Sequence, residues 1–343
     1  MSTLLSRVRF TSLRLVIVAA AIASAYFSWN CKTTTTTPVS PSASDVKLTP
    51  PDSTQGFQVV IGPFDVPKGT EVQKNYYQKL PTTADVWVNK VVFHFNAGSH
   101  HLNIFKSDTA NVPDHVEDTF DAIPFQSWDL VTSSQVDSLV WEMPAGCAFH
   151  LNAHQQMIFQ THYVNASTQA TATGRGLCLI NFYTLPAGTT PMYPVGAVFS
   201  QDKAIDLQPH TEATYLKIVK AFPNDAHILL LTGHFHSRGK SFIVTKWKNG
   251  VTGDTIYKNV TWDEPPVEIF STPYHVAPGD SLAYITQYEN SGSTEIKFGG
   301  HVEIEEHSNL FTYYYPAPSN GKAIYDFDLG SNGGKPIETH SLP

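Results

Sequence analysis

The sequence predicts an all-β protein of the sandwich or jelly-roll kind. From about Gly56 onward, short segments rich in β-branched and aromatic residues are bounded by Gly, Pro, Asn or Asp, as strands are. Examples are residues 85–93, 156–163 and 239–247. No long apolar stripe with a 3.6-residue period and helix caps accompanies them. With 23 Pro and 21 Gly in the chain, turns are frequent, which favours many short strands over a Rossmann or helical-bundle fold.

The chain is long enough for two domains with cores of their own. It has 343 residues, of which 41% are hydrophobic and 12% aromatic. The turn-rich stretch 185–191 follows a strand-like run and predicts the boundary. We therefore expect an N-terminal β domain over residues 56–186 and a C-terminal β domain over residues 187–320. The rest, 321–343, is rich in Gly and polar residues and is expected to be a loose tail.

The first 31 residues are typical of a targeting segment. Arg7, Arg9 and Arg14 precede the apolar run 15–26, which is shorter than the roughly 20 residues that a membrane-spanning helix needs. We expect a signal peptide over residues 1–31 that ends at Cys31, the candidate for lipidation. Because the Ser-, Thr- and Pro-rich segment that follows, residues 32–55, is too polar to pack, we expect it to be a flexible tether.

This N-terminal arrangement resembles that of a bacterial lipoprotein, which implies a membrane anchor through the lipid. Residues 28–30, Ser-Trp-Asn, differ from the Leu and small residues usual before a lipidated cysteine, so an uncleaved N-terminal anchor stays open. Both alternatives predict export to the bacterial cell envelope, facing the periplasm or the exterior. There Cys147 and Cys178 are expected to form a disulfide; two buried thiols are the alternative, since sequence spacing does not fix their distance.

Charge and cysteine content exclude several functional classes. The formal net charge is −8 and the isoelectric point is near 6.0. The body of the chain has no Lys/Arg cluster, so nucleic acid is not an expected partner. Three cysteines without a C-x-x-C pair provide neither a zinc ribbon nor a thioredoxin-type motif. Any metal in this protein must rely on histidine.

Histidines in both halves of the chain form two candidate metal sites. They occur as a pair, a single residue, a spaced pair and a single residue: His100 and His101, His162, His234 and His236, and His307. Neutral imidazole suits copper or zinc, so this series predicts two sites of three ligands each. On a strand, the side chains of an H-x-H pair leave the same face. Adjacent histidines meet one metal only at a bend or a strand end, which Gly98-Ser99 can provide. Each motif alone also fits surface or core histidines.

The residues around these histidines resemble those of the copper type II, ascorbate-dependent monooxygenases, which include the peptidylglycine α-hydroxylating and dopamine β-monooxygenases. The segments that carry the resemblance are 99–102, 160–163, 234–240, 305–310 and 313–316, within residues 57–316. The resemblance implies two jelly-roll-like β-sandwich domains in tandem, each carrying one metal site, with a solvent-filled cleft between the sites. It also implies two copper ions, ascorbate or a similar reductant as co-substrate, and a small-molecule substrate with O₂.

The resemblance assigns a role to each histidine. His100, His101 and His162 match the ligands of the copper that stores and delivers an electron. The catalytic site, where dioxygen binds and a C–H bond breaks, matches His234, His236 and His307. At His307 the family has a methionine, whose soft thioether favours Cu(I), whereas imidazole favours Cu(II) or Zn(II) more. The substitution changes the expected redox balance of the site but keeps a metal ligand there.

Three further positions bear on the substrate. Where the peptide-amidating branch has an arginine, an asparagine and a tyrosine, this chain has Thr232, Asn309 and Phe311. Without the arginine, the terminal carboxylate of a peptide has no charge partner at this position. We therefore do not expect peptide amidation, and we expect a less charged substrate. The sequence thus predicts a copper-dependent monooxygenase that hydroxylates a C–H bond of a small organic molecule. Two alternatives stay open: a non-redox zinc or copper hydrolase with Glu305 or Glu306 as base, and a surface copper-binding protein without turnover.

Overall fold

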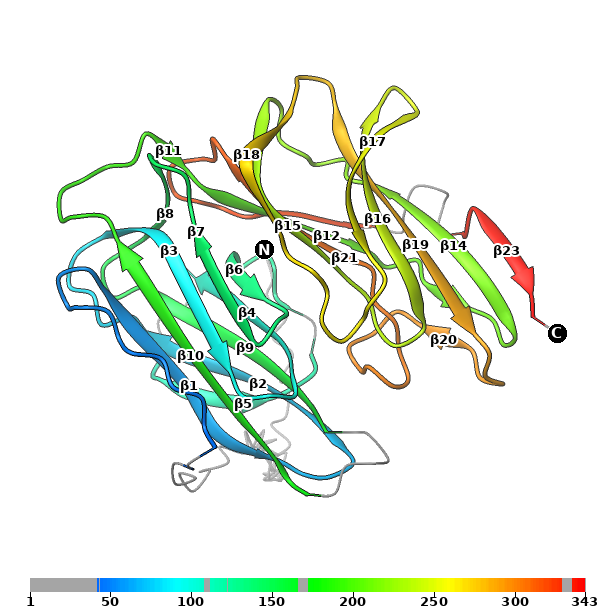
Figure 1. The fold of residues 1–343 in the computed structure, drawn as a ribbon, viewed down its shortest axis with the longest axis horizontal. Helices are drawn as coiled ribbons and strands as arrows, with labels where there is room; N and C mark the ends of the chain where they lie inside the picture. The colour runs from blue at the N-terminus through cyan, green and yellow to red at the C-terminus, as the bar shows by residue number, and fades with distance from the viewer. Residues whose placement is uncertain are drawn as a thin grey trace, which may run out of the picture. The chain divides into compact units, whose positions relative to one another are not determined.

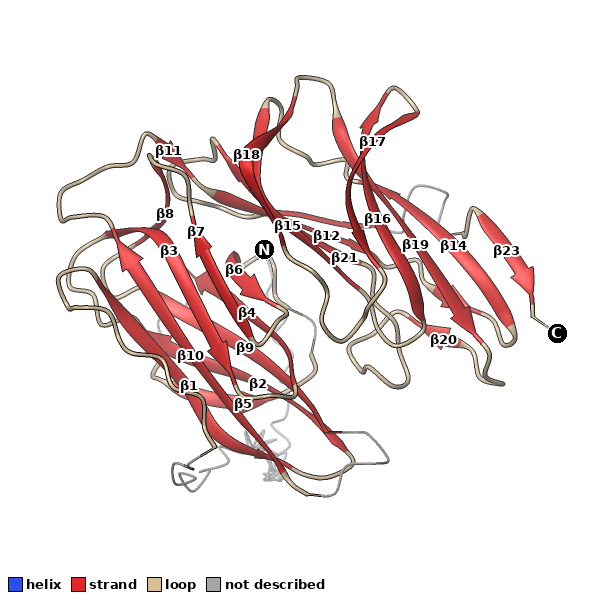
Figure 2. Cartoon of the chain, viewed as in Figure 1, coloured by secondary structure: helices blue, strands red, loops and turns tan. Residues whose placement is uncertain are grey.

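The computed structural model describes residues 42, 44–107, 112–121, 123–165, 172–328 and 335–342, all within one compact unit, Thr34–Pro343. The described part is all-β, as the sequence predicts, and Figures 1 and 2 show only strands and loops there. It contains no helix long and apolar enough to cross a membrane. The expected signal peptide and Cys31 lie outside the described residues.

Two sheets make up the first half of this unit. One has the order β1 (Gly56–Val66), β10 (Gly174–Thr184), β3 (Val86–Phe95), β8 (Cys147–Leu151) and β11 (Tyr193–Pro194), with β7 (Ser138–Glu142) also paired to β3. The other has the order β5 (His115–Asp118), β2 (Thr70–Lys79), β9 (Gln156–Asn165), β4 (Ser99–Ser107) and β6 (Asp129–Ser134).

The second half repeats this plan. One sheet has the order β18 (Glu268–Val276), β15 (Ala226–His234), β21 (Asn309–Tyr315), β12 (Gly196–Asp202) and β22 (Ile324–Asp328). The other has the order β17 (Val251–Asn259), β16 (Gly239–Lys248), β19 (Ser281–Asn290), β14 (Thr211–Ile218) and β23 (Glu338–Ser341). The short strands β13 (Asp206–Leu207) and β20 (Ile296–Lys297) pair with each other.

The same strand order recurs in the two halves. In the first half, β1-β10-β3-β8 form one sheet and β2-β9-β4-β6 the other; in the second half, the corresponding rows are β12-β21-β15-β18 and β14-β19-β16-β17. In the first half β1 therefore pairs with β10, and in the second half β12 pairs with β21. This long-range pairing joins segments far apart in the chain, and the histidine-bearing strands β4, β9 and β15 lie in the interior of their sheets.

Alternation of side chains explains the strands and their core. In β3, Val91, Phe93 and Phe95 are buried while their neighbours Val92 and His94 are only partly buried, the period of two expected for a strand. A second-half core includes residues of β15, β16 and β19, for example Ile228, Val244 and Tyr284. A larger core contains residues of both halves.

Side chains of the two halves pack directly against each other, so the halves are not separated only by solvent. The ring of Trp141 lies 5.0 Å from that of Tyr313, whose hydroxyl lies 2.8 Å from Ser133 Oγ. Tyr325 accepts the backbone N–H of Leu130 at 2.9 Å. These contacts differ from the expected solvent-filled cleft between the metal sites. The difference arises because β21 and β22 present large aromatic side chains to the first half, and burying them against its core is favourable.

The C-terminal residues are not the loose tail that we expected from residues 321–343. Ile324–Asp328 pairs in parallel with β12, and Glu338–Ser341 pairs antiparallel with β14. Lys217 Nζ lies 2.6 Å from Asp326 Oδ1 in an almost fully buried ion pair. The Gly and polar residues that suggested a tail lie between these strands, and residues 329–334 are outside the described part.

The end of the expected tether, residues 32–55, is also held by the first half. Asp45 forms a two-pronged ion pair with Arg175, with Nε–Oδ1 at 2.6 Å and Nη2–Oδ2 at 3.0 Å. The side-chain amide of Asn181 donates to the Thr49 carbonyl at 2.8 Å. The Arg175 guanidinium holds the pKa of Asp45 well below its usual range. The prediction from composition did not include this attachment, because it depends on a few polar contacts and not on the burial of apolar side chains.

The expected disulfide between Cys147 and Cys178 is wrong. Both are free, buried thiols. Cys178 lies on β10 and Cys147 on β8, with β3 between the two strands. Two strand spacings amount to about 9.5 Å, beyond the roughly 7 Å Cα separation that a disulfide spans.

Candidate metal centre

The six histidines singled out by the sequence meet in one cluster. Five are buried, and His307 is partly buried. The ring centres of His100 and His162 lie 5.0 Å apart, and those of His101 and His162 lie 5.2 Å apart. Between the halves, His100 and His234 are 4.6 Å apart. The two histidine sets are therefore neighbours.

A β-bulge brings the two adjacent histidines of β4 to one side. Ser99 pairs with Tyr163 and His101 pairs with His162, so His100 is the extra residue on β4. A bulge breaks the strict alternation of side chains, and this one follows Gly98, whose φ is +91°. The bend that adjacent histidines need in order to meet one metal is thus present at His100 and His101.

The pair His234 and His236 sits at a strand end. His234 is the last residue of β15, and His236 lies in the turn that follows, where the Gly239 N–H donates to its carbonyl at 3.0 Å. Their ring centres are 5.3 Å apart, and His307 lies 4.2 Å from His236. The regular strand expected for the H-x-H pair ends two residues too early, at His234, yet the segment that follows still brings both rings together.

Glu306 ties this turn to the segment that carries His307. Its fully buried carboxylate accepts the backbone N–H groups of His236 at 2.9 Å and Arg238 at 2.8 Å. Burial raises the pKa of Glu306 to about 7, an effect that these N–H groups oppose. Glu305 also contributes, because its carbonyl accepts the Nδ1–H of His236 at 3.0 Å. This hydrogen bond fixes the His236 tautomer and leaves Nε2 as the potential ligand atom.

Glu71 of β2 plays the corresponding part for His162. Its Oε2 lies 3.0 Å from His162 Nε2 and accepts the backbone N–H of Val302 at 3.2 Å. The carboxylate thus orients a first-half histidine and also binds a loop of the second half. A carboxylate behind a histidine is a common arrangement at metal sites, where it fixes the ring and raises its basicity. His162 Nδ1 is then left facing the cluster.

Several ring nitrogens in this cluster have no hydrogen-bond partner among the described residues. They are His100 Nε2, His101 Nε2, His162 Nδ1, His234 Nδ1 and Nε2, His236 Nε2 and His307 Nδ1. Burial lowers the pKa of His236 to about 3 and holds the pKa values of His100, His101, His234 and His307 well below their ordinary value. The rings are therefore neutral at pH 7, the form that binds metal. Buried polar atoms without partners are rare in native proteins, and metal coordination would satisfy these.

The nitrogens form two overlapping groups of possible ligands. His100, His101 and His234 offer atoms within 4.8 Å of one another, and so do His234, His236 and His307. The second group is the triad expected from the sequence. The first contains His234 where we expected His162, which lies beside it, and only His234 belongs to both.

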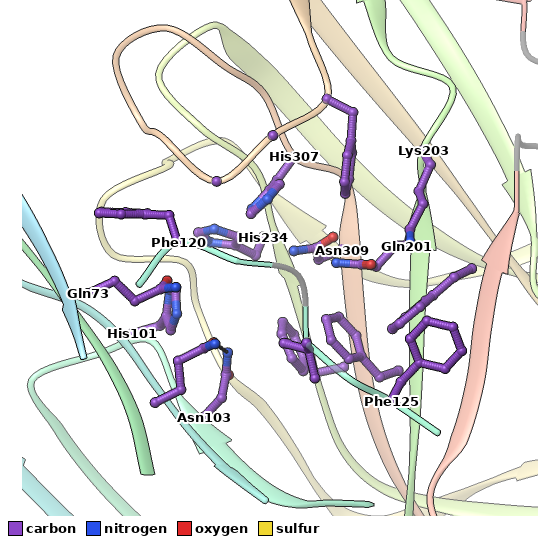
Figure 3. A pocket seen from close by; sticks show the side chains of 18 of the residues that line it. Gln73, His101, Asn103, Phe120, Phe125, Gln201, Lys203, His234, His307 and Asn309 are labelled. Atoms are coloured by element: carbon purple, nitrogen blue, oxygen red, sulfur yellow. Dashed lines mark hydrogen bonds between the residues drawn. The ribbon is translucent and has the colours of Figure 1, made fainter. Parts of the chain in front are cut away.

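A cavity of about 320 Å³ opens beside the histidines. His101, His234 and His307 lie at one end of the side chains drawn in Figure 3, and Lys203 lies at the other. Most of the wall is aromatic or amide, with the phenylalanines Phe120, Phe125, Phe199, Phe298, Phe311 and Phe327. The size and the mainly apolar wall suit a small organic ligand.

The three expected substrate positions separate in the structure. Asn309 and Phe311 line the cavity. Thr232 does not; its hydroxyl donates to the Pro266 carbonyl at 3.0 Å, and its side chain is buried. Sequence reasoning missed Glu71 as a partner of the site, because nothing in the residues around it marks that role. It named Glu306 only as a possible base.

One family model and one curated protein are similar to parts of this chain. Residues 190–325 match the sequence model of the copper type II ascorbate-dependent monooxygenase C-terminal domain. The chain is 22% identical over 250 residues to a human protein described as putative DBH-like monooxygenase protein 2, covering 66% of this chain and 49% of that protein. It thus spans about half the length of this curated relative.

Two solved structures are similar at a low level. The major capsid protein P2 of bacteriophage PM2 gives a TM-score of 0.34 at 9% identity, covering 77% of this chain and all of that one. N-glycanase F (PNGase F) gives a TM-score of 0.27 at 10% identity, covering 87% of this chain and 97% of that one. Neither likeness bears on the function of the histidine cluster.

Proposed function

We propose that this protein is a copper-dependent monooxygenase that hydroxylates a C–H bond of a small organic molecule, using O₂ and ascorbate or a similar one-electron reductant. The observation that carries the proposal is the cluster of neutral, buried imidazoles whose nitrogens lack partners among the described residues, beside a cavity of ligand size. The family match over residues 190–325, which include His234, His236 and His307, supports copper as the metal.

The residues present fit two copper ions. His100 and His101, with His234 in reach and His162 beside them, would hold one ion; His234, His236 and His307 would hold the other. Copper supplies single-electron transfer and a site for dioxygen, and the overall conversion is R–H + O₂ + 2e⁻ + 2H⁺ → R–OH + H₂O. The side chains around the metal sites would position the ligands. Glu71 and Glu305 fix the tautomers of His162 and His236, and Glu306 holds the turn that contains His236. The phenylalanine side chains that line the cavity would orient the substrate.

The hydrolase alternative finds little support in the two glutamates suggested as bases. Both carboxylate oxygens of Glu306 accept backbone N–H groups, and Glu305 Oε2 accepts the His301 N–H at 2.9 Å. Neither residue lines the cavity beside the histidines, where a base would have to reach a metal-bound water. A copper-binding protein without turnover would have no need of this cavity.

Metal analysis and oxygen uptake test the proposal together. Protein purified from copper-supplied cells should hold two copper ions per molecule and consume O₂ when ascorbate and a substrate are added. Zinc as the bound metal without O₂ uptake would favour the hydrolase instead. Copper retained without any ascorbate-dependent O₂ uptake across a substrate panel would favour the copper-binding protein.

We also propose that the halves are tandem jelly rolls and that the protein is exported and lipid-anchored. The repeated strand order, in which β1 pairs with β10 and β12 pairs with β21, supports the jelly-roll assignment. The arginines before the apolar run 15–26, followed by Cys31, support export and lipidation. Mass spectrometry of the N-terminal peptide from membranes tests this: the native protein should carry a lipid at Cys31, and Cys31→Ala should move it to the soluble fraction. An unmodified Cys31 in a membrane-bound protein would indicate an uncleaved anchor.

A further inference from the structure

The cavity beside the histidines contains a cation at its far end. A row of paired residues crosses three neighbouring strands: His234 of β15 pairs with Asn309 of β21, which pairs with Gln201 of β12. Adjacent strands are about 4.8 Å apart, so Gln201 stands roughly 10 Å across the sheet from His234. Lys203 follows two residues later and lines the same cavity (Figure 3).

Lys203 has no acidic partner among the described residues. Its ammonium instead lies over aromatic rings, 4.9 Å from the centre of Phe327 and 5.8 Å from that of Phe125. Partial burial lowers its pKa, because the aromatic surroundings solvate the ammonium less well than water does. Asp121 also lines the cavity, but no ion pair joins it to Lys203 among the described residues, so the ammonium is placed to bind an anionic group that enters from outside.

The wall between the two ends suits a flat apolar group. Phe199 and Phe311 stack with ring centres 4.4 Å apart and planes 16° from parallel. Phe327 meets Phe199 edge-on at 5.0 Å. Asn309 Oδ1, on the path between the ends, is buried without a hydrogen-bond partner among the described residues. Aromatic rings prefer such stacked and edge-on neighbours, and a cavity of about 320 Å³ has room for roughly ten non-hydrogen atoms at about 30 Å³ each.

We propose that the ligand of this cavity is a small aromatic carboxylate, with its carboxylate on Lys203, its ring among the phenylalanines and an aliphatic C–H bond at the histidine end. The hydroxylation of this ligand rests on the proposed function, whereas its binding in the cavity does not. The arginine that the family resemblance would have placed at Thr232 is missing, and Lys203 supplies a cation from a different strand. In the reaction the C–H becomes C–OH, with one oxygen atom of O₂ reduced to water by the two electrons of the reductant.

Equilibrium binding to the copper-loaded, reductant-free protein tests the assignment. The probes are 3-phenylpropionate and 3-phenylpropan-1-ol, which share a skeleton and differ in charge. The carboxylate should bind at least about tenfold more tightly, as a charge-assisted hydrogen bond allows. Lys203→Met should weaken carboxylate binding about tenfold to a hundredfold and leave alcohol binding within a few-fold. Lys203→Arg should retain the preference.

Lys68→Met, on an exposed turn between β1 and β2, is the matched control and should change neither affinity. Lys203→Gln gives a second neutral variant should Lys203→Met fold poorly. Equal affinity for the two probes, or an unchanged ratio in both neutral variants, would overturn the assignment even if the enzyme consumes O₂. Conversely, a Lys203-dependent preference in a protein without ascorbate-driven O₂ uptake would sustain the ligand class and remove the monooxygenase function.

Discussion

The two groups of histidines are held by different kinds of structure. In the first half, His100, His101 and His162 lie on the neighbouring strands β4 and β9, and a bulge sets the direction of their side chains. In the second half, His236 and His307 lie in loops, and the buried carboxylate of Glu306 holds them together. Strand register fixes the first group, whereas hydrogen bonds to Glu306 and to the Glu305 carbonyl fix the second. A change of ligand at position 307, such as imidazole in place of a thioether, is therefore less restricted by strand packing than a change at a ligand of the first group.

His234 stands between these two groups. It is the last residue of strand β15, so it lies on a strand like the histidines of the first group. Its neighbours His236 and His307, in contrast, lie in loops. It is also the only one of the six in which both ring nitrogens are buried and have no hydrogen-bond partner in the described part of the chain. If the halves worked as separate sites, His234 would matter to the second alone.

The largest expected effect follows from this position. We expect His234→Ala to lose both copper ions, because His234 belongs to both groups of possible ligands. The copper content of the purified protein, measured by mass spectrometry, checks this. His340→Ala, at an exposed histidine of β23, should retain both ions. Retention of one tightly bound copper in His234→Ala would show that the two sites share no ligand.

Replacement of His307 should affect one site alone. His307→Ala is expected to lose one copper and all ascorbate-dependent O₂ uptake, and to keep the copper held by His100 and His101. His307→Met should keep both ions and raise the reduction potential of the second, because a soft thioether favours Cu(I). Copper content and potentiometric titration measure both. Two tightly held ions with unchanged O₂ uptake in His307→Ala would remove His307 from the site.

Glu71 should influence the first group more weakly. Glu71→Gln retains an amide oxygen near His162 but removes the charge that raises the basicity of the ring. Loss of such a partner typically costs about 10- to 100-fold in metal affinity. Chelator competition should therefore show weaker binding of the first copper only. Glu117→Gln, which alters a carboxylate bonded to Tyr77 on the same sheet, is the control and should change neither affinity.

These contrasts show what the sequence can predict. Residue type and alternation were sufficient for the all-β fold, and Gly98 indicated the bend at His100. The role of Glu71 depends on the antiparallel register of β2 and β9, where it lies diagonally across from His162. That register joins residues far apart in the chain, so no local motif reports it. The meeting of His100 with His234 likewise depends on the packing of β21 and β22 against the first half, which periodicity does not contain.

The cysteines illustrate the same limit within the first half. Cys178 is opposite Phe95 on β3, whereas β8 pairs with the other end of β3, where Phe149 is opposite Val88. The two thiols are therefore separated both across the sheet and along it. Burial raises the pKa of Cys147 to about 11 and that of Cys178 to about 12, which keeps both protonated and unreactive at neutral pH.

The smallest expected effect is that of a reductant on stability. In Cys31→Ser protein, used so that only Cys147 and Cys178 remain, the native state should show no reactive thiol and the unfolded state should show two without any reductant. The midpoint of thermal unfolding should be the same with and without dithiothreitol, because no covalent link constrains the unfolded state. A disulfide would contribute about 3 kcal/mol, which shifts the midpoint by several degrees and is easily resolved by calorimetry. Such a shift, with no thiols detected after unfolding, would show that the first half is closed by a covalent bond. The stability of that half would then rest on more than the packing and register that position His100, His101 and His162.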